Sequence, residues 1–350
     1  MDISGLGLTH EAIRDAVAAG LVTDRSESGL SILNYTPRAQ YSGAWNTVTR
    51  QCRGLILDGS RVVARGLPKF FNHGQPEADR IELCERVVVM DKVDGSLGVI
   101  YPVDGGWRVA TRGSFTSPQA VEGTKMLDAL GYAPPAGLTV LVEIVYPENR
   151  IVLDYGQRRA LVLLGAVEIA TGASVFPDDP RLDAWPGERV EVLPWVTLLA
   201  ALEAPPRTNA EGLVVMSRDG MRRLKIKQED YVRLHKVLCG LSNASIWEAL
   251  RAGDVGRLFE VAPDELHPWM RSMVAALTAE HDAMLASWVA AFNAIPAGLS
   301  RKDFAAHAKS TPNPGAVFAI LDGRADVSDL AWKAVKPTER ATPTNAEEAA

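Results

Sequence analysis

The sequence has few cysteines and no long apolar run, and both absences narrow what the protein can be. Only three cysteines occur among 350 residues, Cys52, Cys84 and Cys239, and none stands in a C-x-x-C pair. A zinc site or a disulfide framework is therefore not expected, and reduced thiols are typical of a cytoplasmic protein. The longest apolar stretch, residues 161–167, is far too short to span a bilayer, so we expect no membrane segment.

The chain also lacks a surplus of positive charge and a leader-like start. Its formal net charge is −6, which excludes a polycation that coats nucleic acid along its whole surface. Any contact with RNA or DNA must come from a local basic patch. Residues 1–4 show no basic segment followed by an apolar run, so we expect no secretory signal and a cytoplasmic location.

What is present is the composition of an ordinary globular protein. Hydrophobic residues make up 47% of the chain and charged residues 23%, which is enough apolar material for a sizeable core. The length predicts two domains. Strand patterns fill the chain up to about Tyr231 and then give way to helical periodicity. We therefore predict a first domain over residues 1–239, a helical domain over 240–335 and a disordered tail over 336–350.

Apolar periodicity and capping residues predict the elements of both domains. Helices are expected at 10–21, 118–130, 196–203, 245–251, 263–292, 301–310, 315–321 and 328–335. Strands are expected at 30–35, 52–58, 61–64, 87–89, 96–101, 107–113, 138–145, 151–153, 160–167, 190–194, 211–216 and 223–227. Tight turns between several of the strands indicate antiparallel hairpins. The predicted fold class is α+β with antiparallel sheets, followed by a smaller all-α domain.

The most specific pattern is the run Lys92-Val93-Asp94-Gly95-Ser96, which follows the apolar strand at 87–89. A lysine at the end of a buried strand can line a pocket. Asp94-Gly95 marks a turn, and glycine lets a ligand approach the backbone. A plainer alternative is a hairpin turn with a solvated lysine, and the run alone leaves that alternative open.

Charged residues elsewhere would complete a site for attack on a nucleotide. Glu143 ends a predicted strand and Glu211 begins one. Lys225 and Lys227 lie two residues apart on a strand, so they share one face. A neutral amine of Lys92 could attack the α-phosphate of ATP, and the two other lysines would disfavour its charged form and neutralise the phosphates. The carboxylates would hold a divalent metal ion and the ribose.

Each of these residues also has a plainer interpretation when it is taken singly. Glu143 and Glu211 can be exposed charges at strand ends, and the two lysines can be the solvated face of an edge strand. Arg53 can be a surface residue, and Phe70 and Phe71 can plug a minor core. The joint order of the pieces along the chain favours a functional site.

Taken together, the pieces resemble the motifs of covalent nucleotidyltransferases, the superfamily of ATP-dependent ligases and mRNA capping enzymes. The matching segments are KVDG at 92–95, LVEI at 141–144, EGLV at 211–214 and LKIK at 224–227. More narrowly, the chain resembles the T4 RNA ligase 1 group. That likeness is carried by RGLPKFFN at 65–72, TRGS at 111–114 and EIVYPENRIV at 143–152. It spans roughly residues 53–231, and the helical region that follows shows no likeness at the level of residues.

The resemblance implies a nucleotidyltransferase fold and assigns roles to individual residues. Those expected to carry catalysis are Lys92, Glu143, Lys225 and Lys227. Those expected to bind ATP are Arg53, Lys69, Phe71, Gly95, Arg112, Glu143, Lys225, Lys227 and Tyr231. Asp94 and Glu211 are the candidate ligands of Mg²⁺ or Mn²⁺. Arg112 stands where the phage enzyme has lysine, a change that keeps a phosphate contact but alters its geometry.

The activity that the resemblance implies is ATP-dependent RNA ligation. Lys92 would displace pyrophosphate from ATP and hold AMP as a phosphoramidate. AMP would pass to a 5′-phosphate RNA end, and a 3′-hydroxyl would then seal the strand and release AMP. We expect a monomer that acts in RNA repair, with nicked tRNA as a candidate substrate. Two alternatives stay open: a capping-type guanylyltransferase that uses GTP, and a non-catalytic RNA- or nucleotide-binding module.

One segment is a candidate track for the RNA backbone. Residues 218–236 hold seven basic residues against three acidic ones, in contrast to the acidic balance of the whole chain. A basic patch of this kind can bind phosphates without reading sequence. A solvated hairpin is the alternative. The helical domain has few basic residues on its longest predicted helix, so we expect it to recognise the shape of a folded RNA.

Overall fold

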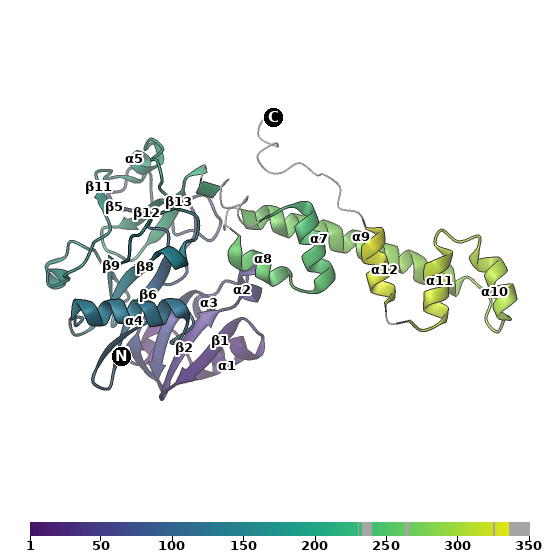
Figure 1. Ribbon diagram of the computed structural model, residues 1–350, viewed down its shortest axis with the longest axis horizontal. Coiled ribbons are helices and arrows are strands. Elements are labelled where there is room, and N and C mark those ends of the chain that lie inside the picture. Colours follow the sequence, from purple (N-terminus) through teal and green to yellow (C-terminus); the bar gives the residue numbers. More distant parts are fainter. Residues whose placement is uncertain (230, 233–239, 263–265, 325, 336–350) are drawn as a thin grey trace. The chain divides into compact units, whose positions relative to one another are not determined.

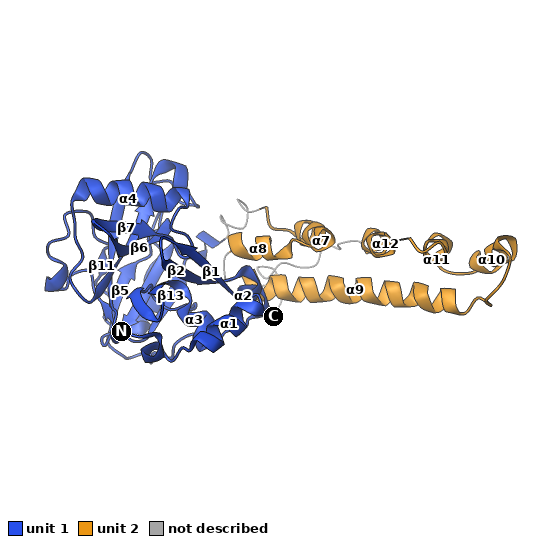
Figure 2. Ribbon diagram, turned by 90° about the horizontal axis from the view of Figure 1, so that it is seen from below, with its two compact units in different colours: residues 1–238 blue, residues 239–350 orange. Residues whose placement is uncertain are grey.

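The computed structural model describes residues 1–229, 231–232, 240–262, 266–324 and 326–335. They belong to two compact units, residues 1–238 and 239–350 (Figure 2). The residue at the predicted boundary, Cys239, and the predicted tail at 336–350 lie outside the described residues. Within the described part of the chain, no helix is both long enough and apolar enough to cross a membrane.

The described strands of the first unit form three antiparallel sheets, which we number along the chain (Figure 1). Sheet 1 has the order β1 (Val22–Glu27), β2 (Leu30–Tyr35), β3 (Arg53–Asp58), β4 (Arg61–Ala64). Sheet 2 has the order β10 (Ser174–Val175), β9 (Ala160–Glu168), β8 (Leu138–Val145), β6 (Ser96–Val103), β7 (Gly106–Ala110). Sheet 3 has the order β11 (Val192–Leu193), β5 (Val87–Asp91), β12 (Gly212–Ser217), β13 (Arg223–Lys227). The described part of this unit includes the helices η1 (Ile3–Leu6), α1 (His10–Ala18), α2 (Pro37–Ser42), α3 (Thr47–Gln51), α4 (Pro118–Leu130), η2 (Pro147–Asn149), η3 (Pro180–Leu182) and α5 (Leu198–Leu202).

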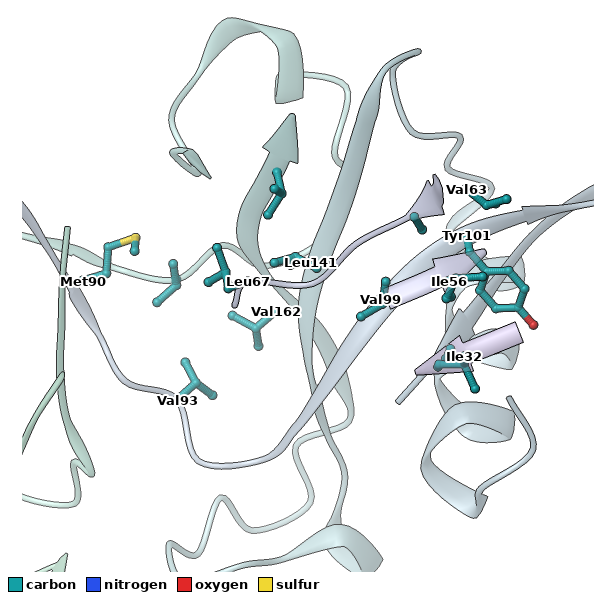
Figure 3. Close-up of a cluster of buried hydrophobic side chains, with 14 of the residues drawn as sticks. Ile32, Ile56, Val63, Leu67, Met90, Val93, Val99, Tyr101, Leu141 and Val162 are labelled. Carbon is teal, nitrogen blue, oxygen red and sulfur yellow. The ribbon is translucent and has the colours of Figure 1, made fainter. Parts of the chain in front are cut away.

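The three sheets share one apolar interior. Side chains alternate between the two faces of a strand, so each sheet turns one set of apolar residues inward. Ile32 and Ile56 come from sheet 1, Val99 and Leu141 from sheet 2, and Met90 from sheet 3 (Figure 3). In that view Met90 lies at one end of the cluster and Ile32 at the other, with Leu141 between them. The strand ends beside this interior carry the candidate site.

The outer face of each sheet is covered by a helix. Ile13 of α1, Leu127 of α4 and Leu198 of α5 are buried against sheets 1, 2 and 3. Full burial of one such side chain contributes ~1.5–3 kcal/mol. The helices therefore hold the sheets from outside while the inner faces remain free to form the common core.

Local signals placed many elements correctly. Helix α4 begins as predicted, because the hydroxyl of Ser117 accepts a hydrogen bond from the backbone N–H of Ala120 and Pro118 occupies the first turn. Strands β2, β4 and β8 have the predicted bounds. The α+β fold class is confirmed.

Two kinds of prediction failed. Strand β1 was missed because its sequence, VTDRSE, is mostly polar and exposed and shows no apolar alternation. The strand predicted at residues 151–153 is wrong, since this segment has no strand conformation. Val152 and Leu153 are buried instead against Tyr231 and Tyr155, whereas Ile151 is exposed. Short apolar runs do not by themselves distinguish a strand from a buried loop.

The described elements of the second unit are all helices: α7 (Asn243–Ala252), α8 (Val255–Val261), α9 (His267–Asn293), α10 (Arg301–Ala308), α11 (Pro314–Leu321) and α12 (Val327–Ala334). Helix α8 was not predicted, and the predicted start of α9 at Pro263 lies outside the described residues. Trp288 of α9 is buried against Ala316 of α11 and Ala331 of α12. The long helix thus carries the apolar side on which the shorter helices pack.

Candidate active site

Strand pairing places the side chain of Lys92 beside a buried carboxylate. The backbone N–H of Lys92 donates to the carbonyl of Gly212 at 3.0 Å, which extends the pairing of β5 with β12 by one residue. The Nζ of Lys92 lies 2.5 Å from Oε2 of Glu211, and the lysine side chain is 23% exposed. The lysine of the sequence motif is therefore a half-buried member of an ion pair and not a solvated turn residue.

Glu211 lies between two lysines. Its side chain is only 4% exposed, and its Oε1 lies 3.4 Å from Nζ of Lys227 on β13. Burial pushes the pKa of Glu211 upward, but the positive charges of Lys92 and Lys227, with a smaller effect of Lys225, hold it below its ordinary value. Glu211 is thus a carboxylate that links the end of β5 to the end of β13.

Glu143 approaches the same place from sheet 2. On β8 it shares one face with Leu141 and Val145, which belong to the shared core, and it is 9% exposed. Burial raises the pKa of Glu143 to about 8; the charge of Lys92 opposes this rise and that of Glu211 supports it. Glu143 therefore holds its proton to a higher pH than an exposed glutamate does, and it loses that proton as the pH rises through about 8.

The pKa of Lys92 corrects one expectation from the sequence. Lys225 and Lys227 were expected to disfavour its charged form. Burial does act in that direction, but the carboxylates of Glu211 and Glu143 outweigh it, and the pKa of Lys92 lies above its ordinary value. Lys92 is therefore an ammonium group in this state and must lose a proton before its nitrogen can attack.

Asp94, two residues after Lys92, holds the following loop together. Its Oδ2 accepts hydrogen bonds from the backbone N–H groups of Val152 and Leu153 at 2.9 and 2.8 Å. Its Oδ1 accepts from the hydroxyl of Tyr231 at 2.8 Å. These bonds explain why the segment at 151–153 forms a loop around Asp94 and not a strand. The assignment of Asp94 to a metal ion stays a prediction, and Glu211 and Glu143 are the carboxylates that face Lys92.

Two glycines of the motifs allow close backbone contacts. A Cβ at Gly95 would lie 2.8 Å from the carbonyl oxygen of Ile144 on β8. Gly212 has a φ of +155°, and a Cβ there would lie 2.1 Å from the carbonyl oxygen of Ile226. Glycine is required at both positions by packing. Contact of Gly95 with a nucleotide stays a prediction.

Three of the residues expected to bind ATP gather around aromatic rings. The Nζ of Lys69 lies 5.6 Å from the ring centroid of Tyr35 and 5.4 Å from those of Trp45 and Phe71. Arg112 donates a hydrogen bond to the hydroxyl of Tyr35 at 2.8 Å. The ring faces attract the ammonium of Lys69, and the hydroxyl of Tyr35 orients the guanidinium of Arg112. Both cations are thereby held in place.

Arg53 completes this group of cations. Its Nη1 donates to the carbonyl of Leu67 at 3.2 Å, and its guanidinium lies 5.8 Å from the ring of Phe70. Burial lowers the pKa of Arg53, against the opposing effect of Tyr35. Phe71 is buried, whereas Phe70 is only half-buried. Of the two aromatics on this loop, Phe70 is therefore the more accessible to a ligand.

Backbone hydrogen bonds join this cationic loop to β13. The N–H of Lys225 donates to the carbonyl of Phe71 at 3.0 Å, and the N–H of His73 donates to the carbonyl of Lys225 at 2.9 Å. The loop of Lys69 and the strand that carries Lys225 and Lys227 are thus held side by side. The structure brings residues from several distant segments of the first unit to one site.

Within its described residues, the basic segment at 218–236 uses part of its charge inside the fold. Arg222 is paired with Glu85 at 2.6 Å. Arg223 is buried, and it donates to the carbonyl of Gly220 at 2.8 Å. Arg233 and Lys236 lie outside the described residues. Several charges counted in the sequence are therefore used within the fold.

Sequence reasoning missed Tyr35, Tyr155 and Arg207. Tyr35 orients Arg112, and the hydroxyl of Tyr155 accepts a hydrogen bond from the backbone N–H of Asp94 at 3.0 Å. Arg207 contacts the residue before Lys92. None of the three lies in a motif, so only their tertiary contacts reveal them.

Comparisons with known proteins find similarity to RNA ligases. Residues 51–185 match a family model, RNA_lig_T4_1, described as RNA ligase. RNA ligase 1 of bacteriophage TS2126 is 32% identical over 147 residues, which cover 37% of this chain and 37% of the phage protein. A Thermovibrio ammonificans protein, named provisionally as an RNA ligase, is 31% identical over 134 residues and covers 35% of each chain. The chain thus spans about a third of the length of these curated relatives.

A likeness also exists among solved structures. The Naegleria gruberi RNA ligase with PPi has 18% identity and a TM-score of 0.35, with coverage of 44% of this chain and 52% of that one. A likeness of this degree carries no argument about individual residues. The family match does identify a segment: residues 51–185 are similar in sequence to RNA ligases of the T4 RNA ligase 1 type.

Proposed function

We propose that this protein is an ATP-dependent RNA ligase that carries AMP covalently on Lys92. The observation that supports this most directly is the ion pair of Lys92 with the buried Glu211, at 2.5 Å, with Lys227 on the other side of the carboxylate. An amine held by a buried carboxylate, beside further cations, suits attack on a phosphate. The family match over residues 51–185 supports the same activity.

In the first step, the Nζ of Lys92 attacks the α-phosphorus of ATP as the bond to the β-phosphate breaks, and pyrophosphate leaves. Lys92 begins as an ammonium because Glu211 and Glu143 keep its pKa high. Any cation that neutralises these carboxylates removes that effect and lowers the pKa of Lys92. Lys225 and Lys227 are placed to balance the charge of the phosphates.

The described residues fit a divalent ion that is shared with the nucleotide. No group of three or more His, Cys, Asp or Glu side chains in the described ranges could hold a metal ion alone. Mg²⁺ bound with a nucleotide needs only one or two protein carboxylates, because phosphates and waters complete its shell. Glu211, with Glu143 beside it, meets that need. Such an ion would supply charge stabilisation at the phosphates.

The later steps act on RNA. AMP passes from Lys92 to a 5′-phosphate end, and a 3′-hydroxyl then attacks the activated phosphate and releases AMP. We place this reaction in RNA repair in the cytoplasm, carried out by a monomer, with nicked tRNA as the candidate substrate. The ATP contacts fall to Arg53, Lys69, Arg112 and Tyr231 together with the site lysines.

The test is covalent labelling with ATP or GTP that carries a radioactive α-phosphate. Wild-type protein should form an AMP adduct with ATP in the presence of Mg²⁺ or Mn²⁺ that is stable to alkali and released by acid, as a phosphoramidate is, and Lys92→Ala should form none. Lys125→Ala is the matched control, because Lys125 is an exposed lysine paired with a glutamate at 3.3 Å outside the site. Labelling by GTP alone would indicate a capping-type enzyme, and absence of any adduct would indicate a non-catalytic module.

A further inference from the structure

A half-buried ion pair is formed by Arg207 and by Asp91, the residue immediately before Lys92. The Nη2 of Arg207 donates to Oδ1 of Asp91 at 2.6 Å and to the carbonyl of Gly212 at 2.7 Å. Asp91 immediately precedes Lys92, and Gly212 immediately follows Glu211. The side chains of Arg207 and Asp91 are 22% and 27% exposed, so their hydrogen bonds are less screened than those of a surface pair.

The carbonyl of Gly212 connects the backbone of Lys92 with that of Glu211, the residue before Gly212. It accepts one hydrogen bond from the backbone N–H of Lys92 at 3.0 Å and a second from Arg207. A carbonyl oxygen has two lone pairs, and these two donors occupy both. A shift of Arg207 would therefore disturb the backbone of Lys92 and that of Glu211 together.

Gln228 anchors the other end of Arg207. Its Nε2 donates to the carbonyls of Arg207 and Ala210 at 2.9 and 2.6 Å, and its Oε1 accepts from the N–H of Arg207 at 2.5 Å. The backbone N–H of Gln228 donates to the carbonyl of Glu211 at 3.0 Å. Hydrogen bonds thus hold the backbone of Arg207 at one end and its guanidinium at the other. The contact with Asp91 is therefore held in one geometry.

We propose that Arg207 and Asp91 are positioning residues that set the separation of Lys92 from Glu211 for the adenylylation step. This inference rests on the proposed function. Neither side chain is among the groups that would contact ATP, and both act through the backbone on either side of the ion pair. Their loss should therefore slow the attack of Lys92 without weakening the binding of ATP.

The experiment uses the full-length chain and measures single-turnover formation of the AMP adduct over a range of ATP concentrations. Arg207→Met removes both hydrogen bonds, and the maximal rate should fall by ~10²-fold, as for a small misplacement of a reacting group. The ATP concentration for half-maximal rate should stay within about twofold. Arg207→Lys keeps the charge and one donor and should recover part of the rate. Asp91→Asn keeps the shape of the aspartate and should give a smaller loss of the same kind.

Arg222→Met is the matched control, because it breaks an arginine–glutamate pair of equal length, 2.6 Å, at the far end of the same hairpin. Its adenylylation rate should stay near that of the wild type. The positioning role is overturned if wild type is labelled and Arg207→Met is labelled equally fast, or if only the ATP requirement rises, or if Arg222→Met loses as much. If Arg207→Met does not fold, Asp91→Asn decides the question alone. A wild type that takes no label from ATP overturns the proposed function and, with it, this inference.

Discussion

At the scale of single residues, the carboxylates around Lys92 have two opposed effects. Glu211 holds the lysine at 2.5 Å and so orients it, but together with Glu143 it keeps the lysine protonated. A protonated amine has no lone pair with which to attack phosphorus. In the reaction that we propose, this arrangement orients the amine of Lys92 but keeps it unreactive until positive charge reaches the carboxylates.

The ionisation of Glu143 should make the free energy of unfolding depend on pH, and this dependence can be measured without any substrate. Its pKa in the folded protein is about 8, well above the ordinary value of 4.5. Between these values the folded state holds a proton that the unfolded state has released, so the stabilising contribution is complete below about pH 4.5 and is lost as pH rises through 8. Urea unfolding from pH 5 to 8.5 should show wild type losing stability relative to Glu143→Gln as the pH rises.

The control for this titration is a glutamate with a shift of opposite sign. Hydrogen bonds from Arg181 and Thr171 hold the pKa of Glu168 below its ordinary value. Glu168 is therefore ionised in both the folded and the unfolded state over most of the window, so Glu168→Gln should differ from wild type by a nearly constant amount. A constant difference for Glu143→Gln as well would show that Glu143 ionises normally.

At the scale of elements, the pairing of β12 with β13 places Glu211, just before β12, beside Lys227 at the end of β13. Gly212 makes this close pairing possible. A Cβ at this position would lie 2.1 Å from the carbonyl oxygen of Ile226. Gly212→Ala must therefore push the strands apart and strain a φ of +155°. We expect a loss of ~2 kcal/mol or more in urea unfolding, together with loss of the AMP adduct.

Gly59→Ala separates the effect of backbone strain at a positive φ from the effect of pushing β12 and β13 apart. Gly59 has a φ of +56° in the turn between β3 and β4, and a Cβ added there would have no described atom beyond its own chain neighbours within 4 Å. The substitution should cost only ~1–2 kcal/mol from backbone strain and leave adduct formation intact. Equal effects of the two substitutions would mean that the close approach of β13 at Gly212 has no special importance.

Elements could be predicted from the sequence where their signals were local. The Ser117 cap and Pro118 specify the start of α4 within four residues of chain, and the structure agrees. The segment at 151–153 was mistaken for a strand because its partner, Asp94, lies about 58 residues away and leaves no mark beside it. Polar β1 was missed because it is a strand only through its pairing with β2.

The candidate site divides in the same way at the scale of the whole molecule. Lys92, Glu143, Glu211 and Lys227 stand in recognisable motifs, and the structure brings them together, although their individual roles stay predictions. Arg207 could not be found from the sequence, since its partner Asp91 is 116 residues away. Pattern reveals groups that a reaction needs, but it does not reveal the residues that hold those groups in place.

The division of the chain into two compact units predicts which activities a truncated chain should keep. Every described residue of the candidate site lies in the unit at 1–238. A chain that ends at Gly240 should therefore still form the AMP adduct and join a simple oligonucleotide with 5′-phosphate and 3′-hydroxyl ends. It should lose its advantage on nicked tRNA, if the helical unit recognises the shape of a folded RNA. Ligation assays on both substrates measure this, and equal losses on the two, or loss of the adduct, would assign the helical unit a structural role.

The place of β5 within sheet 3 has a consequence for the newborn chain. Met90 of β5 pairs with Val192 of β11, and Asp91 pairs with Leu213 of β12, so both partner strands are translated about 100 residues later or more. At ~5–20 residues per second, the apolar strand waits roughly 5–20 s on the ribosome without a neighbour. An unpaired run of this kind is prone to aggregate. A ribosome that stalls in this interval would therefore leave the strand that precedes Lys92 exposed to chaperones and to other unfolded chains.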